Sequence, residues 1–168
     1  KVQFEKIKNV MNQKWQDTLY IPYLQANTNT YGSLEKLREV YTELLNLDEN
    51  VCEISIATRA DELQDEKIKL LSEINKIIPV QIELGLQTSN ESTANIINRN
   101  CTNEEIIDAV KRLKKENIEV VIHIMNGLPG EDKIDMLNTI DFVNSLNPEG
   151  IKIHSLCILK NTKMGDDF

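Results

Sequence analysis

The sequence predicts an α/β protein whose strands form one parallel sheet. Strand-like and helix-like segments alternate at regular intervals through the 168 residues, as expected for βαβ units with right-handed crossovers. Apolar residues run almost without interruption through 118–125, which is typical of a strand covered on both faces. The apolar runs 80–86 and 118–125 each end in a turn with polar side chains, where parallel α/β proteins place their ligands.

The first part of the chain is predicted to hold two helices with a strand between them. Apolar side chains recur at spacings of three and four over residues 2–15, so we expect a helix with these side chains on one face. Residues 19–26 follow as a strand, in which Pro22 favours an edge or irregular position. After a polar loop, Ser33 can cap a second helix whose apolar stripe extends to Leu45.

The middle of the chain is predicted to contain two strands, at 52–58 and 80–86. A polar turn at 59–65 and a helix over 66–78 separate them, and Pro79 ends that helix. A short helix is expected at 90–97. Thr102 and Glu105 then have the spacing of a capping box, which predicts the start of a further helix.

The last part of the chain is predicted to contain a strand at 118–125, a helix at 132–146 and a strand at 150–159. No helix is expected over 161–168, so the final strand lacks a covering helix. The first helix likewise lacks a preceding strand. We therefore expect the sequence to be a piece of a longer polypeptide.

The composition is that of an ordinary globular protein, with 40% apolar and 27% charged residues. No apolar run approaches the roughly 20 residues that cross a bilayer, and no signal-peptide pattern is present. We therefore expect no membrane association and a cytoplasmic location. The formal net charge of −8 does not indicate nucleic-acid binding, because affinity for phosphate backbones depends on basic residues.

The residues that follow the predicted strands are mostly neutral amides and hydroxyls, which suit holding a polar ligand better than hydrolysing one. They include Gln25, Asn27, Thr28, Thr58, Gln87, Thr88 and Asn126. For His123 and His154, in apolar strands, a hydrogen-bonded core histidine is the simplest interpretation. The GLPGE turn at 127–131 has too few glycines for a phosphate loop, and chain reversal explains it in isolation. Spacing alone leaves the function open.

Five segments together resemble a known family. They read YLQANTNTYGSLEKLREVY, SIATRAD, IELGLQTSNESTANIINRNCT, AVKRLKKENIEVVIHIMNGLPGE and GIKIHSLCILKNT. The series resembles the radical S-adenosylmethionine (SAM) superfamily, in particular uncharacterised bacterial Fe-S oxidoreductases related to the elongator catalytic subunit and to oxygen-independent coproporphyrinogen oxidase. The resemblance runs in register over nearly the whole chain. Its most specific part is GLQT, then Arg99 twelve residues after Gln87, then GLPGE.

The resemblance implies a partial TIM-like (β/α)6 barrel of parallel strands. Residues 1–168 would form a radical SAM core fragment, from the first helix through the sixth strand, with no second domain. In the family, a CxxxCxxC-type loop after the first strand holds a [4Fe-4S] cluster, and SAM ligates its open iron. Cys52, Cys101 and Cys157 form no such loop. We therefore expect the cluster ligands to lie outside this sequence and the fragment alone to be inactive.

The resemblance also assigns the SAM contacts, position by position. They are Gln25, Asn27, Thr28, Thr58, Arg59, Gln87, Arg99, His123, Gly127 and Leu156. The loop 25–30 would bind the SAM amino group, Gln87 a ribose hydroxyl and Arg99 the methionine carboxylate. His123 would contact the adenosine. Ala57 stands where many relatives have a ribose-binding Glu.

The remaining assignments concern the adenine pocket and the reaction. The stretch from Gly127 to Gly130, together with Leu156, would shape the adenine pocket through close approach of the backbone. The implied reaction is reductive cleavage of SAM by the cluster, which gives methionine and a 5′-deoxyadenosyl radical that abstracts hydrogen from a substrate. The alternative is a SAM- or nucleotide-binding module, or a degenerate barrel that serves as a scaffold, without radical chemistry. The sequence does not reveal the substrate.

Overall fold

The computed structural model describes residues 2–15 and 18–167, and these contain one sheet of five parallel strands. The strands lie side by side in chain order: β1 (Tyr23–Leu24), β2 (Ile54–Thr58), β3 (Val80–Gln87), β4 (Glu119–Asn126) and β5 (Gly150–Ser155). Each neighbouring pair is parallel. The predicted parallel α/β fold is confirmed, with the strand order of a barrel wall.

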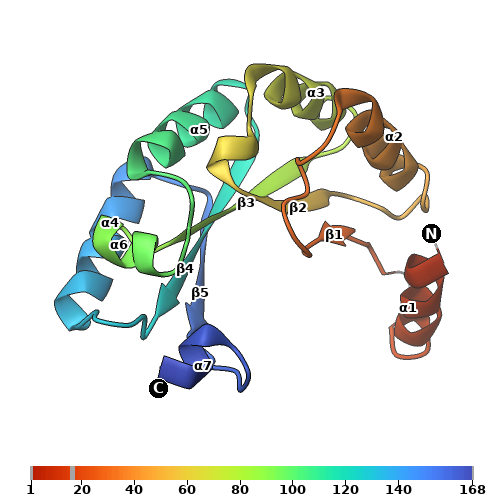
Figure 1. The fold of residues 1–168 in the computed structure, drawn as a ribbon. Helices are drawn as coiled ribbons and strands as arrows, with labels where there is room; N and C mark the ends of the chain where they lie inside the picture. The colour runs from red at the N-terminus through yellow and green to blue at the C-terminus, as the bar shows by residue number, and fades with distance from the viewer. Residues whose placement is uncertain (1, 16–17, 168) are drawn as a thin grey trace.

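The helices between the strands lie along the outside of the curved sheet, and the concave face is open (Figure 1). The connecting helices are α2 (Leu34–Leu45), the 3-10 turn η1 (Ala60–Glu62), α3 (Asp65–Asn75), α4 (Glu91–Ile96), α5 (Asn103–Lys115) and α6 (Lys133–Leu146). Helix α1 (Val2–Asn12) precedes β1, and α7 (Lys163–Asp167) follows β5.

The core lies between the sheet and these outer helices. Side chains alternate along a strand, so every second residue faces the helices. On β3 these residues are at most 1% exposed: Val80, Ile82, Leu84 and Leu86. Burial of an aliphatic side chain of this size stabilises the fold by about 1.5–3 kcal/mol. The same alternation directs the other residues of β3 to the concave face, which matters for the site.

Side-chain caps begin the helices where the sequence predicts them. Ser33 Oγ accepts a hydrogen bond from Lys36 N at 3.3 Å, at the start of α2. At the start of α5, Thr102 Oγ1 accepts from Glu105 N at 3.2 Å, while Glu105 Oε2 accepts from Thr102 N at 2.7 Å. Both predictions are confirmed, and such a cap stabilises a helix by about 1 kcal/mol.

Two predicted strands are shorter than expected, and one helix was not predicted. The strand expected over 19–26 is reduced to the two residues of β1 and an isolated bridge between Tyr20 and Val51. Pro22 has no N–H to donate, and Asn27 turns the chain with a φ of 64°, so the extended run is short. The last strand ends at Ser155 instead of 159, and α7 lies where no helix was predicted.

The helix predicted at the start of the chain is present as α1, but its apolar face is not buried. No residue of α1 is buried, and Val10 is 56% exposed. The Phe4 ring meets the Tyr20 ring edge to face, with centroids 5.4 Å apart. A groove of about 500 Å³ lies among α1, residues 18–24 and α2, so the apolar face of α1 is only partly covered. Among residues 2–15 and 18–167, no helix is long and apolar enough to cross a membrane.

Candidate functional site

The concave face carries a cluster of polar side chains centred on Glu83. Its carboxylate accepts hydrogen bonds from Tyr23 Oη at 2.7 Å, Ser55 Oγ at 2.8 Å and Lys152 Nζ at 2.9 Å. His123 Nε2 lies 2.5 Å from the same carboxylate. These residues, which we call the Glu83 cluster, come one from each of the five strands. A single carboxylate therefore ties the whole sheet together across its concave face.

Hydrogen bonding keeps Glu83 ionised despite its burial. Burial alone would raise its pKa, but hydrogen bonds from Tyr23, Lys152, Ser55 and His123 outweigh this effect and lower the pKa to about 2. Burial and the hydrogen bond to Glu83 raise the pKa of Tyr23. Burial lowers the pKa of Lys152, but its hydrogen bonds to Glu83 and Tyr23 prevail and raise it. At neutral pH the cluster thus holds one carboxylate, one ammonium and a protonated phenol.

Two histidines adjoin Glu83 on the concave face. His154 Nε2 lies 3.3 Å from His123 Nδ1, and the ring centroids are 5.0 Å apart. Burial lowers the pKa of His123 below its ordinary 6.5, although the hydrogen bond to Glu83 acts in the opposite direction. His123 is therefore neutral at pH 7, and both of its ring nitrogens are engaged within the protein.

The carboxyl end of β3 is distorted at Gln87. The pairing register between β3 and β4 shifts between Gly85 and Gln87, and Gln87 has a φ of 66°, a conformation that costs an L-residue about 1–3 kcal/mol. The side-chain Oε1 of Gln87 is buried and has no hydrogen-bond partner among the described residues. A Cβ on Gly85 would lie 3.0 Å from Gln87 Nε2, so the small residue makes room for the amide. Backbone strain and an unsatisfied acceptor coincide here.

The GLPGE turn follows β4 and lies against the same rim. Its glycines, Gly127 and Gly130, have φ values of 85° and 81°, which favour glycine. Leu128 is buried, and Thr88 Oγ1 donates a hydrogen bond to Glu131, which connects this turn to the end of β3. A Cβ on Gly127 would lie 3.9 Å from Leu156 Cβ. The structure therefore brings Gln87, Gly127 and Leu156 to one rim of the sheet.

Arg99 lies behind this rim in a closed network of hydrogen bonds. Its guanidinium donates to the carbonyl oxygens of Thr88 at 2.7 Å and Cys101 at 2.7 Å. It also donates to Asn103 Oδ1 at 3.1 Å and Glu91 Oε2 at 3.0 Å. The Arg99 side chain is 2% exposed, whereas that of Glu91 is 46% exposed. Glu91 is the most exposed of these partners.

The other predicted contacts are spread over two places. Gln25 and Asn27 are exposed and Thr28 is half-buried in the loop after β1, where Asn29 Nδ2 donates to Leu24 O and Ala57 O. Thr58 faces the helices, because it is buried in alternation with Ile54 and Ile56, and it shares a hydrogen bond with Thr30. Arg59 pairs with Asp61. The structure does not bring Thr58 and Arg59 together with the concave-face residues.

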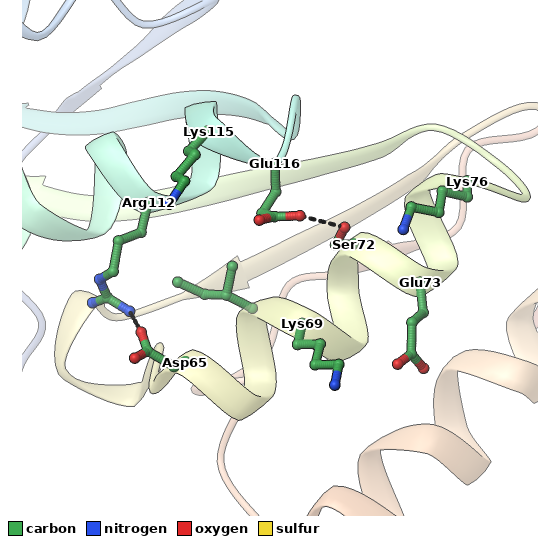
Figure 2. Close-up of a pocket in the computed structure, with 9 residues that line it drawn as sticks. Asp65, Lys69, Ser72, Glu73, Lys76, Arg112, Lys115 and Glu116 are labelled. Atoms are coloured by element: carbon green, nitrogen blue, oxygen red, sulfur yellow. Dashed lines mark hydrogen bonds and ion pairs between the residues drawn. The ribbon is translucent and has the colours of Figure 1, made fainter.

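A separate groove of about 610 Å³ lies between α3 and α5 on the outer surface, away from the strand ends (Figure 2). Two pairs of its polar side chains form hydrogen bonds across the groove. Ser72 Oγ donates to Glu116 at 2.7 Å, and Arg112 donates to Asp65 at 3.3 Å. These contacts are those of a solvated interface between two helices, and the rim of the concave face remains the better candidate site.

Comparison with known proteins decides the family. The model of the radical SAM superfamily matches residues 4–143. The chain belongs to this superfamily. It is 47% identical over 162 residues to the uncharacterized protein YtqA of Bacillus subtilis, and the match covers 96% of this chain and 50% of that protein. The chain thus spans about half the length of this relative.

Solved structures support the barrel fold of this radical SAM chain. The archaeal Elp3 of Methanocaldococcus infernus superposes with a TM-score of 0.79 at 17% identity, covering 96% of this chain and 42% of that one. Coproporphyrinogen III oxidase (HemN) of Escherichia coli superposes with a TM-score of 0.68 at 21% identity, covering 79% and 30%. The expected partial TIM-like barrel is confirmed at the level of the fold.

The two groups that radical SAM proteins use fit this chain differently. Cys52 is half-buried, Cys101 is buried and Cys157 is exposed, and they lie on separate segments. Within the described part of the chain, no group of three or more His, Cys, Asp or Glu residues could hold a metal ion. The residues present therefore do not fit a [4Fe-4S] cluster. SAM fits better, because Gln87 offers a buried, unpaired amide oxygen at the rim.

Sequence reasoning missed the Glu83 cluster. Tyr23, Ser55, Glu83 and Lys152 were not among the predicted site residues, although the structure joins them directly. A signal was available, since Glu83 interrupts the apolar run 80–86 at a position whose strand neighbours on the same face are also polar or small.

Proposed function

We propose that residues 1–168 form the SAM-binding part of a radical SAM Fe-S oxidoreductase, extending from its first helix to its sixth strand. The observation that carries this proposal is Gln87. Its backbone is strained, and its buried Oε1 lacks a partner within the described part of the chain, so it can gain a hydrogen bond when a ligand hydroxyl arrives. A ribose diol is suited to this amide, which both donates and accepts.

The neighbouring residues support a nucleoside at this rim. The Gly127 and Gly130 backbone allows close approach, and Leu156 offers an apolar side chain next to Gly127. His154 and the Glu83 cluster lie deeper on the concave face, where a substrate would be held. When bound with a cluster in an intact protein, SAM supplies hydrogen-abstraction chemistry through a 5′-deoxyadenosyl radical.

For Arg99 we propose a conditional role. Its guanidinium binds the methionine carboxylate only if that carboxylate takes the place of Glu91, the most exposed of its partners. In that case the remaining bonds to Thr88 O and Cys101 O hold the guanidinium in position. Arg99 then links the ligand to the turn after β3.

A second candidate function is a SAM- or nucleotide-binding module without radical chemistry. The scattered positions of Cys52, Cys101 and Cys157 favour it for the chain by itself. Anaerobic reconstitution with iron and sulfide separates the two functions. We expect this chain alone to retain no cluster and to cleave no SAM, while still binding SAM.

The test of the SAM proposal is equilibrium binding of SAM to the purified protein. Gln87→Ala should weaken binding by about tenfold to a hundredfold, the effect of one to two hydrogen bonds in a buried site. The matched control is Gln81→Ala on the same strand and the same face, which should leave affinity unchanged. Equal affinity of Gln87→Ala and the wild type would contradict the proposal.

A further inference from the structure

The chain contains two histidines, and both lie on the concave face of the sheet. His123 is on β4 and His154 on β5, with Nδ1 of the first 3.3 Å from Nε2 of the second. His123 is in turn 2.5 Å from Glu83 through its Nε2. The three side chains form a linear series that runs from the buried carboxylate towards the open part of the face.

The positions of the protons follow from Glu83. An ionised carboxylate can only accept hydrogen bonds, so His123 Nε2 carries the proton that it donates to Glu83. Burial keeps His123 neutral, and its Nδ1 is then an acceptor. The contact between the rings therefore requires His154 Nε2 to be the donor. A neutral His154 is left with an unprotonated Nδ1.

We infer that His154 is a proton acceptor for a substrate bound on the concave face, with His123 and Glu83 as positioning residues that fix its tautomer. Among the described residues, His154 Nδ1 has no hydrogen-bond partner, and the residue is half-buried. The side chains of Glu83 and His123 are only 8% and 14% exposed. His154 at one end of the series is thus accessible, whereas Glu83 at the other end is buried and hydrogen-bonded. This is the arrangement of a base that is held in position by an orienting group.

The step is a transfer of one proton without oxidation or reduction. A substrate X–H bond breaks, X keeps the electron pair, and the proton forms an N–H bond at His154 Nδ1. The substrate class is a molecule with a weakly acidic X–H group, such as an ammonium or a hydroxyl. His154 then carries the charge, still donating through Nε2 to His123.

The charged groups around the pair disfavour a positive charge on His123. Lys152 Nζ already pairs with Glu83 at 2.9 Å, and its positive charge opposes a second cation at His123. Tyr23 donates to the same carboxylate and stays protonated. A proton accepted at His154 Nδ1 is therefore not passed on to His123 and can return to the product. This inference concerns the substrate side of the face, and its test needs no SAM.

Nitrogen NMR of protein labelled with ¹⁵N-histidine tests the tautomers. We expect both rings to be protonated at Nε2 at neutral pH, with a coupling across the bond from His154 Nε2 to His123 Nδ1. In His123→Phe, which keeps a ring of similar size, His154 should become a mixture of tautomers. The control Ser155→Ala, at an exposed neighbour, should change neither ring. A native His154 protonated mainly at Nδ1 would overturn the inference.

Acylation by diethyl pyrocarbonate gives a second readout, because it reports unprotonated, accessible imidazole nitrogens. His154 should react faster than His123, and its rate at Nδ1 should fall in His123→Phe, because part of the His154 population then carries its proton at Nδ1. If His123→Phe does not fold, as judged by circular dichroism, Glu83→Gln replaces it and should slow acylation in the same direction. An unchanged rate in the folded variant would refute the positioning role.

Discussion

Glu83 and Gln87 lie four residues apart on the same face of β3, yet their surroundings are opposite. The Glu83 carboxylate receives hydrogen bonds from partners on four other strands. The Gln87 amide oxygen is buried with no hydrogen-bond partner among residues 2–15 and 18–167, on a backbone in the left-handed region. One strand therefore carries a saturated polar group in its middle and an unsatisfied one at its end.

The difference separates a residue that stabilises the fold from one that is ready for a ligand. A saturated buried carboxylate holds its neighbours in fixed positions, because any movement breaks several hydrogen bonds at once. An unsatisfied acceptor costs about 1–3 kcal/mol in the free protein and recovers that free energy when a partner binds. Stability should thus depend on Glu83, and ligand affinity on Gln87.

The largest expected effect is on stability, in Glu83→Ala. Removal of the carboxylate leaves Lys152 and His123 without their shared partner, so the free energy of unfolding should fall by about 2–4 kcal/mol. This loss is smaller than for a fully buried ion pair, because the Lys152 side chain is 40% exposed and water screens its charge. Urea unfolding followed by circular dichroism measures this loss. Gln81→Ala on the same face is the control and should change stability by less than about 1 kcal/mol. Equal losses of stability in the two variants would contradict the stabilising role of the Glu83 carboxylate.

Acid should weaken the same cluster. The pKa of Glu83 is about 2 in the folded protein against an ordinary 4.5, so its contribution is present above pH 4.5 and is lost as pH falls towards 2. The full loss is about 3 kcal/mol, from the difference between the two pKa values. The lowered pKa of His123 acts in the same direction as pH falls below 6.5, because unfolding then takes up a proton.

Urea unfolding measured from pH 7 down to pH 2.5 tests this dependence. The wild-type free energy of unfolding should fall throughout this range, and in Glu83→Gln the part below pH 4.5 should be much smaller, because no carboxyl titrates at that position. Gln87→Ala should keep the wild-type profile, since Gln87 does not titrate. A wild-type profile in Glu83→Gln would assign the acid sensitivity to other carboxylates.

Sequence reasoning succeeded where the determining interactions are local. Ser33 and Thr102 cap their helices through residues three positions away, and the alternation on β3 reflects a period of two. Patterns of this kind are complete within a short window. The fold class and most helix starts were therefore predictable.

The cluster was not predictable, because its partners are far apart in the chain. Tyr23 is 60 positions and Lys152 69 positions from Glu83, and no short-range pattern connects them. The predicted rim residue Gln87 was found by family resemblance, but its strained φ and unpaired oxygen depend on the bulge opposite β4. Burial of Arg99 likewise depends on carbonyl groups that only the folded turn presents.

The smallest expected effect on stability has the opposite sign and is found at Gln87. Gln87→Gly removes the unsatisfied oxygen, and glycine adopts the φ of 66° without strain. Both effects stabilise the folded protein by more than the extra conformational entropy of glycine stabilises the unfolded chain. The free energy of unfolding should therefore rise by about 1 kcal/mol. Urea unfolding measures this gain, and Leu86→Gly next to it, in the buried row, should instead destabilise the fold. The same Gln87→Gly protein should bind SAM more weakly. A loss of stability in Gln87→Gly would mean that the amide already has a stabilising role in the free protein, and the contrast with Glu83 would no longer hold.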